Sequence, residues 1–208
     1  MRLDYTKSLL VIVGGWNPNI VNEVWIRKNL LDHPNERPNV GVSGGISPNG
    51  IYTTTVDAVF NNVRLTILGE RLELNLVNSN NFTHIENCVR KLCNSQPNTL
   101  VSGYGVNFTY ITEPISNDLM DIFNHDTLSE HVLLQTHTYN GVNLDGIVTN
   151  MSIEINKANN KSGISFNFHF NIDALATLIQ HIAEYPINSL KEKAVEFASS
   201  QYGLRLEN

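Results

Sequence analysis

Hydrophobic and polar residues alternate along three consecutive stretches in the first half of the chain. The stretches are Tyr52–Phe60, Val63–Ile67 and Leu72–Leu76. A period of two predicts strands with one face on a core and one polar face. Asn61-Asn62 and Gly69 separate the stretches and are typical turn residues. The pattern therefore predicts an antiparallel meander.

The second half of the chain repeats this arrangement. We expect a strand over His131–Tyr139, followed by Asn140-Gly141, which is the strongest short hairpin signal in a sequence. One or two strands should follow over Val142–Asn156, with a candidate bend at Asp145-Gly146. Ile164–Ile172 alternates most regularly of all and predicts a further strand.

Helix signals follow the runs of strands. Each helix is predicted from apolar residues at helical spacing, and its start from the polar capping residue that precedes them. The expected starts are Asn19 as the N-cap of a helix over Ile20–Leu31, a capping box of Thr83 and Glu86, Ser116, Asp173, and a capping box of Ser189 and Glu192. Buried strands are expected over Leu9–Val13 and Val101–Thr112, while Val40–Ile46, with three glycines, could be a short strand or an irregular segment.

Strands followed by helices in both halves predict an α+β fold. We expect antiparallel β-meanders covered on one side by helices, in two meander-plus-helix halves. The 208 residues suit a single compact domain over 1–208, with 1–126 and 127–208 as possible subdomains. No stretch resembles a linker, and the halves share no residue-level identity, so an internal duplication stays open.

Composition narrows the class of protein. Only 16% of residues are charged, the net charge is −6, and asparagine occurs 29 times against 14 Lys+Arg. Without a basic run, binding to nucleic acid by phosphate neutralisation is not expected. No apolar run approaches the roughly 18 residues of a membrane span. The run Leu9–Val13 is too short for a signal peptide and precedes Gly14-Gly15, so we expect a cytoplasmic protein without membrane contact.

The motifs that mark common enzymes are missing from the sequence. It contains no phosphate-binding P-loop, no dinucleotide-binding glycine motif between strand and helix, no serine nucleophile elbow and no H-E-x-x-H helix. Cys88 and Cys93 lie five residues apart on a predicted helix and are interpreted as small buried hydrophobes rather than a disulfide or zinc site. No cofactor or metal is expected, and a non-enzymatic role is favoured.

Histidines on strands provide the alternative, enzymatic hypothesis. His131 and His137 share one strand face about 20 Å apart, and His169 lies on the polar face of another strand. If these strands neighbour each other, His137 and His169 with Asp145 or Glu154 could form a metal or acid–base site of a small hydrolase. The simpler interpretation is a solvated sheet face that happens to carry histidines.

Neutral hydrogen-bonding side chains on the predicted polar strand faces are the more informative feature. We select as candidate binding residues Gln135, Tyr139, Asn167, Asn171, Thr53, Thr55 and Asn75. Amides lose less free energy on leaving water than ions do, and the centres of protein interfaces are poor in Lys, Glu and Asp. An AT-rich gene would also raise asparagine. It would raise lysine too, and only 7 lysines are present, so base composition alone does not explain the amides but stays an open alternative beside a binding surface.

The sequence therefore favours a non-enzymatic, soluble protein-interaction subunit of a larger bacterial or viral (phage-related) assembly. Its partner would be another protein or a second copy in a homo-oligomer. A third hypothesis is a small-ligand-binding protein, with a pocket between sheet and C-terminal helices. The aromatic residues that could line this pocket are Trp16, Trp25, Tyr104 and Tyr110.

Overall fold

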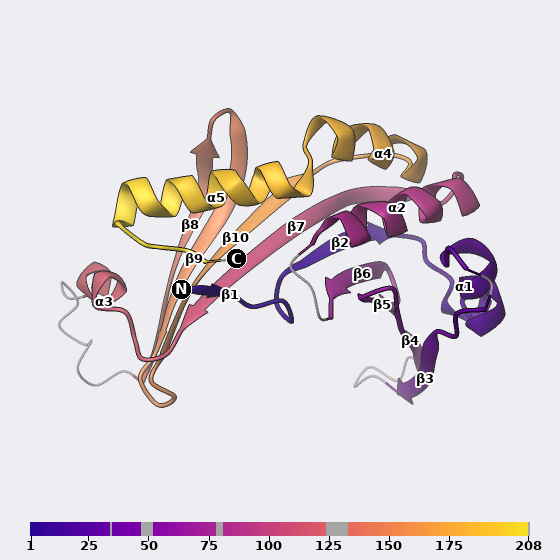
Figure 1. Cartoon of the computed structure of the whole chain (residues 1–208), viewed down its shortest axis with the longest axis horizontal. Helices are drawn as coiled ribbons and strands as arrows, with labels where there is room; N and C mark the ends of the chain where they lie inside the picture. The colour runs from indigo at the N-terminus through magenta and orange to yellow at the C-terminus, as the bar shows by residue number, and fades with distance from the viewer. Residues whose placement is uncertain (34, 47–51, 78–80, 124–132, 208) are drawn as a thin grey trace. The chain divides into compact units, whose positions relative to one another are not determined.

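The computed structural model describes residues 1–33, 35–46, 52–77, 81–123 and 133–207 of the 208-residue chain (Figure 1). These ranges contain ten strands, five α-helices and one 3-10 helix. In chain order they are β1 (Arg2–Leu3), β2 (Leu9–Gly14), η1 (Pro18–Ile20), α1 (Glu23–Asn29), β3 (Asn39–Ile46), β4 (Tyr52–Phe60), β5 (Val63–Leu68), β6 (Arg71–Leu76), α2 (Thr83–Ser95), β7 (Val101–Thr112), α3 (Asn117–Phe123), β8 (Leu134–Leu144), β9 (Ile147–Asn156), β10 (Lys161–Phe170), α4 (Leu175–Glu184) and α5 (Ile187–Tyr202).

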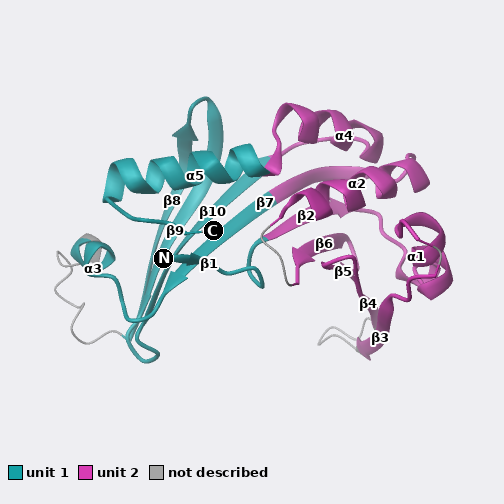
Figure 2. Ribbon diagram, viewed as in Figure 1, with its two compact units in different colours: residues 1–8, 106–169, 188–208 teal, residues 9–105, 170–187 magenta. Residues whose placement is uncertain are grey.

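The strands form an antiparallel sheet in the hydrogen-bonding order β3-β4-β5-β6-β2-β7-β10-β9-β8, with β1 beside β7. The predicted α+β fold with antiparallel strands is therefore confirmed. The chain divides into two compact units (Figure 2). Unit 1 comprises residues 1–8, 106–169 and 188–208, and unit 2 comprises residues 9–105 and 170–187. Each unit thus combines several chain segments, whereas the predicted subdomains were continuous.

Unit 2 contains the predicted meander. Strands β4, β5 and β6 pair in antiparallel register, and Asn61 and Asn62 turn between β4 and β5 with φ of 46° and 62°. Alternate residues of the three strands are buried, as the pattern predicted. Helix α2 contributes its apolar stripe, Phe82, Ile85, Val89 and Leu92, to the buried core of this unit. Val40–Ile46, left open above, belongs to strand β3, which pairs with β4 along its whole length.

Unit 1 is built around β8, β9, β10 and the second part of β7. Its core consists of apolar residues on one face of these strands and on α5. They are Phe108, Tyr110, Met151, Ile153, Ile155, Ile164, Phe166, Phe168, Leu190, Ala194 and Ala198. Figure 2 shows α5 lying across the strands of this unit. No described helix is long and apolar enough to cross a membrane.

The predicted hairpin turn at Asn140-Gly141 is wrong. Strand β8 continues through both residues, and its register against β9 shifts between Tyr139 and Val142, which marks a β-bulge. Gly141 takes a φ of 71° there, a backbone conformation that a bulge requires as much as a hairpin turn does. The turn to β9 lies instead at Asp145-Gly146, with φ of 49° and 86°.

Several predicted helix starts are wrong by a few residues. The first helix begins at Glu23, because Asn22 rather than Asn19 accepts a hydrogen bond from the Trp25 N–H (3.0 Å). Pro18–Ile20 forms a separate 3-10 turn. Val24 in this helix points into solvent and is 72% exposed.

Neither predicted capping box forms. Thr83 is the first residue of α2, and its N–H donates to Asn81 Oδ1 (3.1 Å), so an Asx turn precedes this helix. Ser189 and Glu192 lie inside α5, which begins at Ile187. The N-cap of α4 is Ala174, without a side-chain hydrogen bond, in place of Asp173. Asn81 and Glu86 provide the polar groups at the starts of α2 and α5, and sequence spacing alone identifies neither of them.

Candidate functional site

Strand pairing decides which side chains share a face. In unit 1, β9 contributes Thr149, Met151, Ile153 and Ile155 to the buried face, which we call the inner face. Residues directly opposite each other on paired strands project from the same face, and neighbours along a strand project from opposite faces. The face carrying the intervening residues of β8, β9 and β10 is the outer face. Each candidate residue on these three strands therefore belongs to either the inner or the outer face.

His137 and His169 do not come together. His137 pairs with Ile153, whose side chain is fully buried, so His137 belongs to the inner face of edge strand β8. His169 follows Phe168, which is fully buried and pairs with Thr149, so His169 belongs to the outer face. The two imidazoles are thus separated by the sheet itself. The predicted histidine pair is not assembled in this structure.

Asp145 and Glu154 do not complete such a site either. The Asp145 carboxylate, at the β8–β9 turn, accepts a hydrogen bond from Lys193 Nζ of α5 at 2.8 Å. Glu154 is exposed and lies opposite Thr136 on β8, so it is paired with neither His137 nor His169. Within the described ranges, no three His, Cys, Asp or Glu side chains are grouped as a metal site would require. His131 lies outside the described residues.

Gln135 and Tyr139 also lie on the inner face rather than on a solvated polar face. Gln135 pairs with Ile155 and is only 8% exposed, and its Oε1 has no hydrogen-bond partner among the described residues. Tyr139 pairs with Met151, and its ring lies 6.5 Å from that of His137. Alternation along the edge strand was predicted correctly, but these polar residues occupy its inner face.

The outer face of unit 1 carries a row of hydroxyl groups. Thr138, Ser152 and Ser165 lie opposite one another on β8, β9 and β10. The Ser165 hydroxyl lies 3.0 Å from that of Thr109 on β7 and hydrogen-bonds with it. Asn167 projects from the same face beside this row, opposite Asn150. This part of the outer face is therefore rich in neutral hydrogen-bonding groups, as the candidate residue Asn167 suggested, whereas Glu154 and Lys161 bring charge to the same face near the β9–β10 turn.

The candidate residues of unit 2 are spread over its own polar strand face. Thr53 lies opposite Gly45, Thr55 lies opposite Leu68, and Asn75 lies between Arg64 and Leu9. This face also carries two ion pairs, Arg64 with Asp57 (3.3 Å) and Arg71 with Glu73. Asn171 follows β10 and is exposed. Three of these candidates share a face, but they do not converge on one point.

Of the four aromatic residues proposed to line a ligand pocket, Trp16, Tyr104 and Tyr110 belong to the buried core, whereas Trp25 is only partly buried. Tyr104 and Tyr110 are completely buried, and burial raises the pKa of both phenols. Tyr104 stacks on Phe170 with ring centroids 4.9 Å apart. A cavity of about 160 Å³ in unit 2, between α2 and α4, is lined by other residues, among them Glu86, Arg90 and Ile182. The structure thus gives the aromatic residues a packing role.

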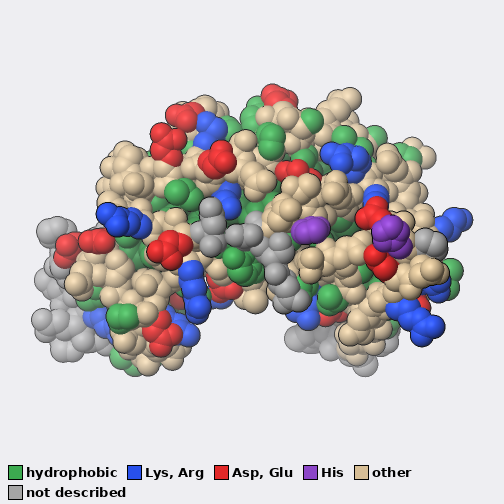
Figure 3. Space-filling view, in the orientation of Figure 1, with side chains coloured by type: hydrophobic (Ala, Val, Ile, Leu, Met, Phe, Trp, Pro, Cys, Tyr) green, Lys and Arg blue, Asp and Glu red, His purple; other side chains and the backbone are tan. Residues whose placement is uncertain are grey.

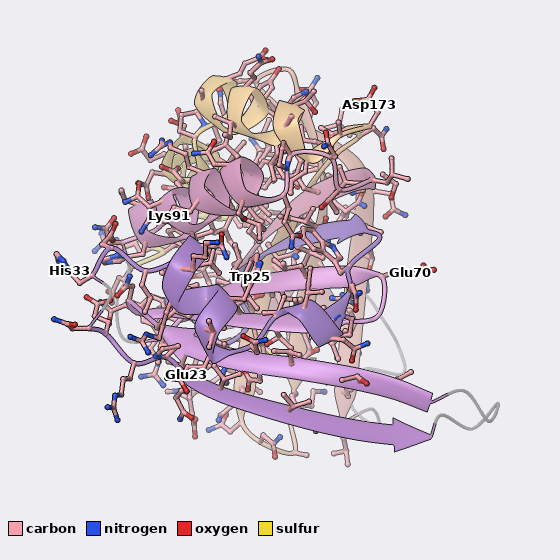
Figure 4. All side chains as sticks on the ribbon, turned by 90° about the vertical axis from the view of Figure 1, so that its right-hand side faces the viewer. Glu23, Trp25, His33, Glu70, Lys91 and Asp173 are labelled. Atoms are coloured by element: carbon pink, nitrogen blue, oxygen red, sulfur yellow. The ribbon has the colours of Figure 1, made fainter. Side chains whose placement is uncertain are left out.

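Both edges of the sheet share an unusual chemistry. Strand β3 ends the sheet on one side and β8 on the other. The sequences Asn39–Ile46 and Leu134–Leu144 contain no Asp, Glu, Lys or Arg. Figure 4 shows β3 along the margin of unit 2. Proteins usually protect a strand edge with charged side chains, especially lysine, because unpaired backbone groups there can pair with another chain.

Charge is present on the molecule but not on these strands. Figure 3 shows Lys, Arg, Asp and Glu side chains dispersed among uncharged ones over the face in view. The β8 edge is interrupted by the bulge at Tyr139–Val142, whereas no register shift interrupts the pairing of β3 with β4. The sequence left Val40–Ile46 open between a strand and an irregular segment because three glycines hide the alternation of β3, although its lack of charged residues is apparent in the sequence.

Comparison with known proteins adds no further constraint. No protein-family model matches the chain, no curated protein matches it, and no solved structure matches its fold.

Proposed function

We propose that this protein is a non-enzymatic subunit that binds another protein chain, as part of a larger assembly, through the uncharged edge strands of its sheet and the hydroxyl-bearing part of its outer face in unit 1. The observation that carries the proposal is the absence of charged residues from both edge strands, β3 and β8. A strand edge offers a row of backbone donors and acceptors, and a partner strand that pairs with it gains main-chain hydrogen bonds.

The outer face of unit 1 supports the same role. Its hydroxyl row and Asn167 can be removed from water at a smaller cost in free energy than ionised side chains. The centres of protein interfaces are depleted in Lys, Glu and Asp in the same way. The histidine alternative lacks this support, because His137 and His169 project from opposite faces.

Site-specific photocross-linking in the native cell tests the proposal. A photoreactive amino acid is placed at Ser43 on β3 or at Thr136 on β8, both of which are exposed. The matched control carries it at Asn94, an exposed residue of helix α2 that belongs to neither edge strand. We expect cross-links to protein from at least one edge position and none from Asn94. Absence of a protein cross-link from both edges would overturn the proposal.

A further inference from the structure

Strand β3 is the least protected edge in the described part of the chain. All residues from Gly41 to Gly45 are exposed, and Val42 is 67% exposed although it pairs with fully buried Val56. The strand has no charge, no proline and no bulge, which are the usual devices against edge pairing. Its free side therefore presents an uninterrupted row of backbone groups together with an exposed valine.

We propose that β3 pairs antiparallel with β3 of a second copy of this chain, so that the two sheets join across a two-fold axis at Val42. This inference rests on the proposed function and names the partner of one edge. In an antiparallel pair, side chains that lie opposite each other share a face. In the register centred on Val42, the numbers of two paired residues add up to 84. Residues on the face of β3 that carries Val42 then lie opposite residues on the same face of the second copy.

This register fits the sequence of the strand to itself. Val42 meets Val42 at the axis, Val40 meets Gly44, Gly41 meets Ser43, and Asn39 meets Gly45. Within Asn39–Gly45, each larger side chain away from the axis thus faces glycine. A register centred on Ser43 would lose the contact between the two Val42 side chains and pair Val40 with Ile46, and one centred on Gly41 would pair fewer residues.

The other available edge is a poorer partner for β3. Strand β8 shifts its register between Tyr139 and Val142, so a straight strand can follow only part of it. Pairing of β3 with β8 of another copy would also join unlike edges. Such contacts produce open chains of molecules unless successive rotations bring the chain back into a ring, whereas pairing of β3 with itself produces a closed dimer. Because β3 carries no charged residue, its self-pairing brings no like charges into direct contact, although each copy has a net charge of −6.

We expect the dimer to be weak and dependent on concentration. One strand edge contributes less surface than the roughly 800 Å² per partner of a standard stable interface. Sedimentation of the full-length wild-type chain over a range of concentrations should show the mass rising from 23.3 kDa toward twice that value. Val42→Lys should abolish this rise, because it places two like charges at the axis.

Val24→Lys is the matched control. Val24 is 72% exposed on α1, so the same substitution changes the charge equally without touching β3, and it should leave dimerisation as in the wild type. A wild-type chain that stays at 23.3 kDa at every concentration overturns self-pairing. Dimerisation of Val42→Lys to the wild-type extent overturns it as well.

Disulfide formation tests the register. Val42→Cys should form a covalent dimer under mild oxidation faster than Val24→Cys and faster than Ser43→Cys, since Ser43 faces Gly41 in this register. The natural thiols do not interfere, because Cys88 and Cys93 are buried and burial raises their pKa values to about 12 and about 11. Equal rates at the three positions overturn the register.

The two proposals fail separately. If the chain stays monomeric but Ser43 cross-links to a different protein, self-pairing is wrong and the interaction function stands. If it is monomeric and neither edge cross-links to protein, both are wrong.

Discussion

Asn150 Oδ1 accepts a hydrogen bond from the backbone N–H of Gly141 at 3.1 Å. This contact ties β9 to the bulge of the edge strand β8, at the point where the register shifts. The bulge is what distinguishes β8 from the regular edge β3. One asparagine side chain thus stabilises the irregularity that keeps β8 from presenting a continuous edge.

Asn150→Ala should lower the free energy of unfolding by about 1 kcal/mol, the usual net value of one such hydrogen bond. Urea unfolding measures it. Asn167→Ala is the matched control, since Asn167 lies directly opposite Asn150 on the same face and makes no such bond to the bulge. We expect the control to stay within about 0.5 kcal/mol of wild type. Equal losses in both variants would show that the bulge contact is not the cause.

Glu86 caps the last helix from a distant part of the sequence. Its Oε1 accepts a hydrogen bond from the backbone N–H of Ile187, the first residue of α5, at 3.0 Å. A carboxylate at a helix N-terminus satisfies a free donor and interacts favourably with the helix dipole. Glu86→Ala should therefore cost about 1–2 kcal/mol of stability, and Glu86→Gln less, because the amide keeps an acceptor oxygen.

Glu192→Ala provides the control for this prediction. Sequence spacing places Glu192 in a capping box, but the structure places it inside α5. Its removal should change the urea midpoint little. If Glu192→Ala destabilises the protein as much as Glu86→Ala, the assignment of the α5 cap to Glu86 is wrong.

The buried tyrosines predict a loss of stability at alkaline pH. The hydroxyls of Tyr104 and Tyr110 have no hydrogen-bond partner among the described residues, and burial raises the pKa of both phenols. In the unfolded chain a tyrosine ionises near pH 10. Above that pH the unfolded state loses these protons while the folded state retains them, so the free energy of unfolding falls as pH rises.

Tyr104→Phe and Tyr110→Phe should each be neutral or stabilising by up to about 1 kcal/mol at pH 7, because an unpaired buried hydroxyl is removed. The double variant should also lose less stability between about pH 10 and pH 11.5 than the wild type. Tyr139→Phe, on the edge strand, serves as the control. An alkaline loss as steep in the double variant as in the wild type would contradict the prediction.

His137 and His169 should act independently. Their side chains project from opposite faces of the sheet, so the effects of His137→Ala and His169→Ala on stability should add within about 0.5 kcal/mol. The comparison pair is His137→Ala with Tyr139→Ala, whose rings lie 6.5 Å apart and should show measurable coupling. A coupling energy above about 1 kcal/mol between the two histidines would restore the histidine-site hypothesis.

Local pattern predicted the strands well where burial alternates without interruption. Tyr52–Phe60 is a strand with the bounds expected, and the Asn61-Asn62 turn follows it. The pattern failed where the same backbone conformation occurs in two different structures. Asn140-Gly141 favours a left-handed backbone, which both a hairpin turn and a bulge use, so only the pairing with β9 distinguishes them.

The candidate site shows the same division. Alternation correctly assigned Gln135, His137 and Tyr139 to one face of a strand and His169 to the polar face of another. It could not relate the two faces, because a period of two says which residues of one strand belong together and nothing about a neighbour's register. The helix caps depend likewise on distant partners, as Glu86 and Ile187 illustrate.

The sequence by itself determined the α+β class, the alternating core and the scarcity of charge on the strands, since these follow from residue type and local spacing. Only the tertiary structure decided that β3 and β8 are the edges, and that His137 and His169 are held apart by the sheet. The physical reason is that strand order and register come from backbone hydrogen bonds between segments far apart in the chain. Those bonds place two strands without charged residues at the edges of the sheet, one of them bulged and one regular.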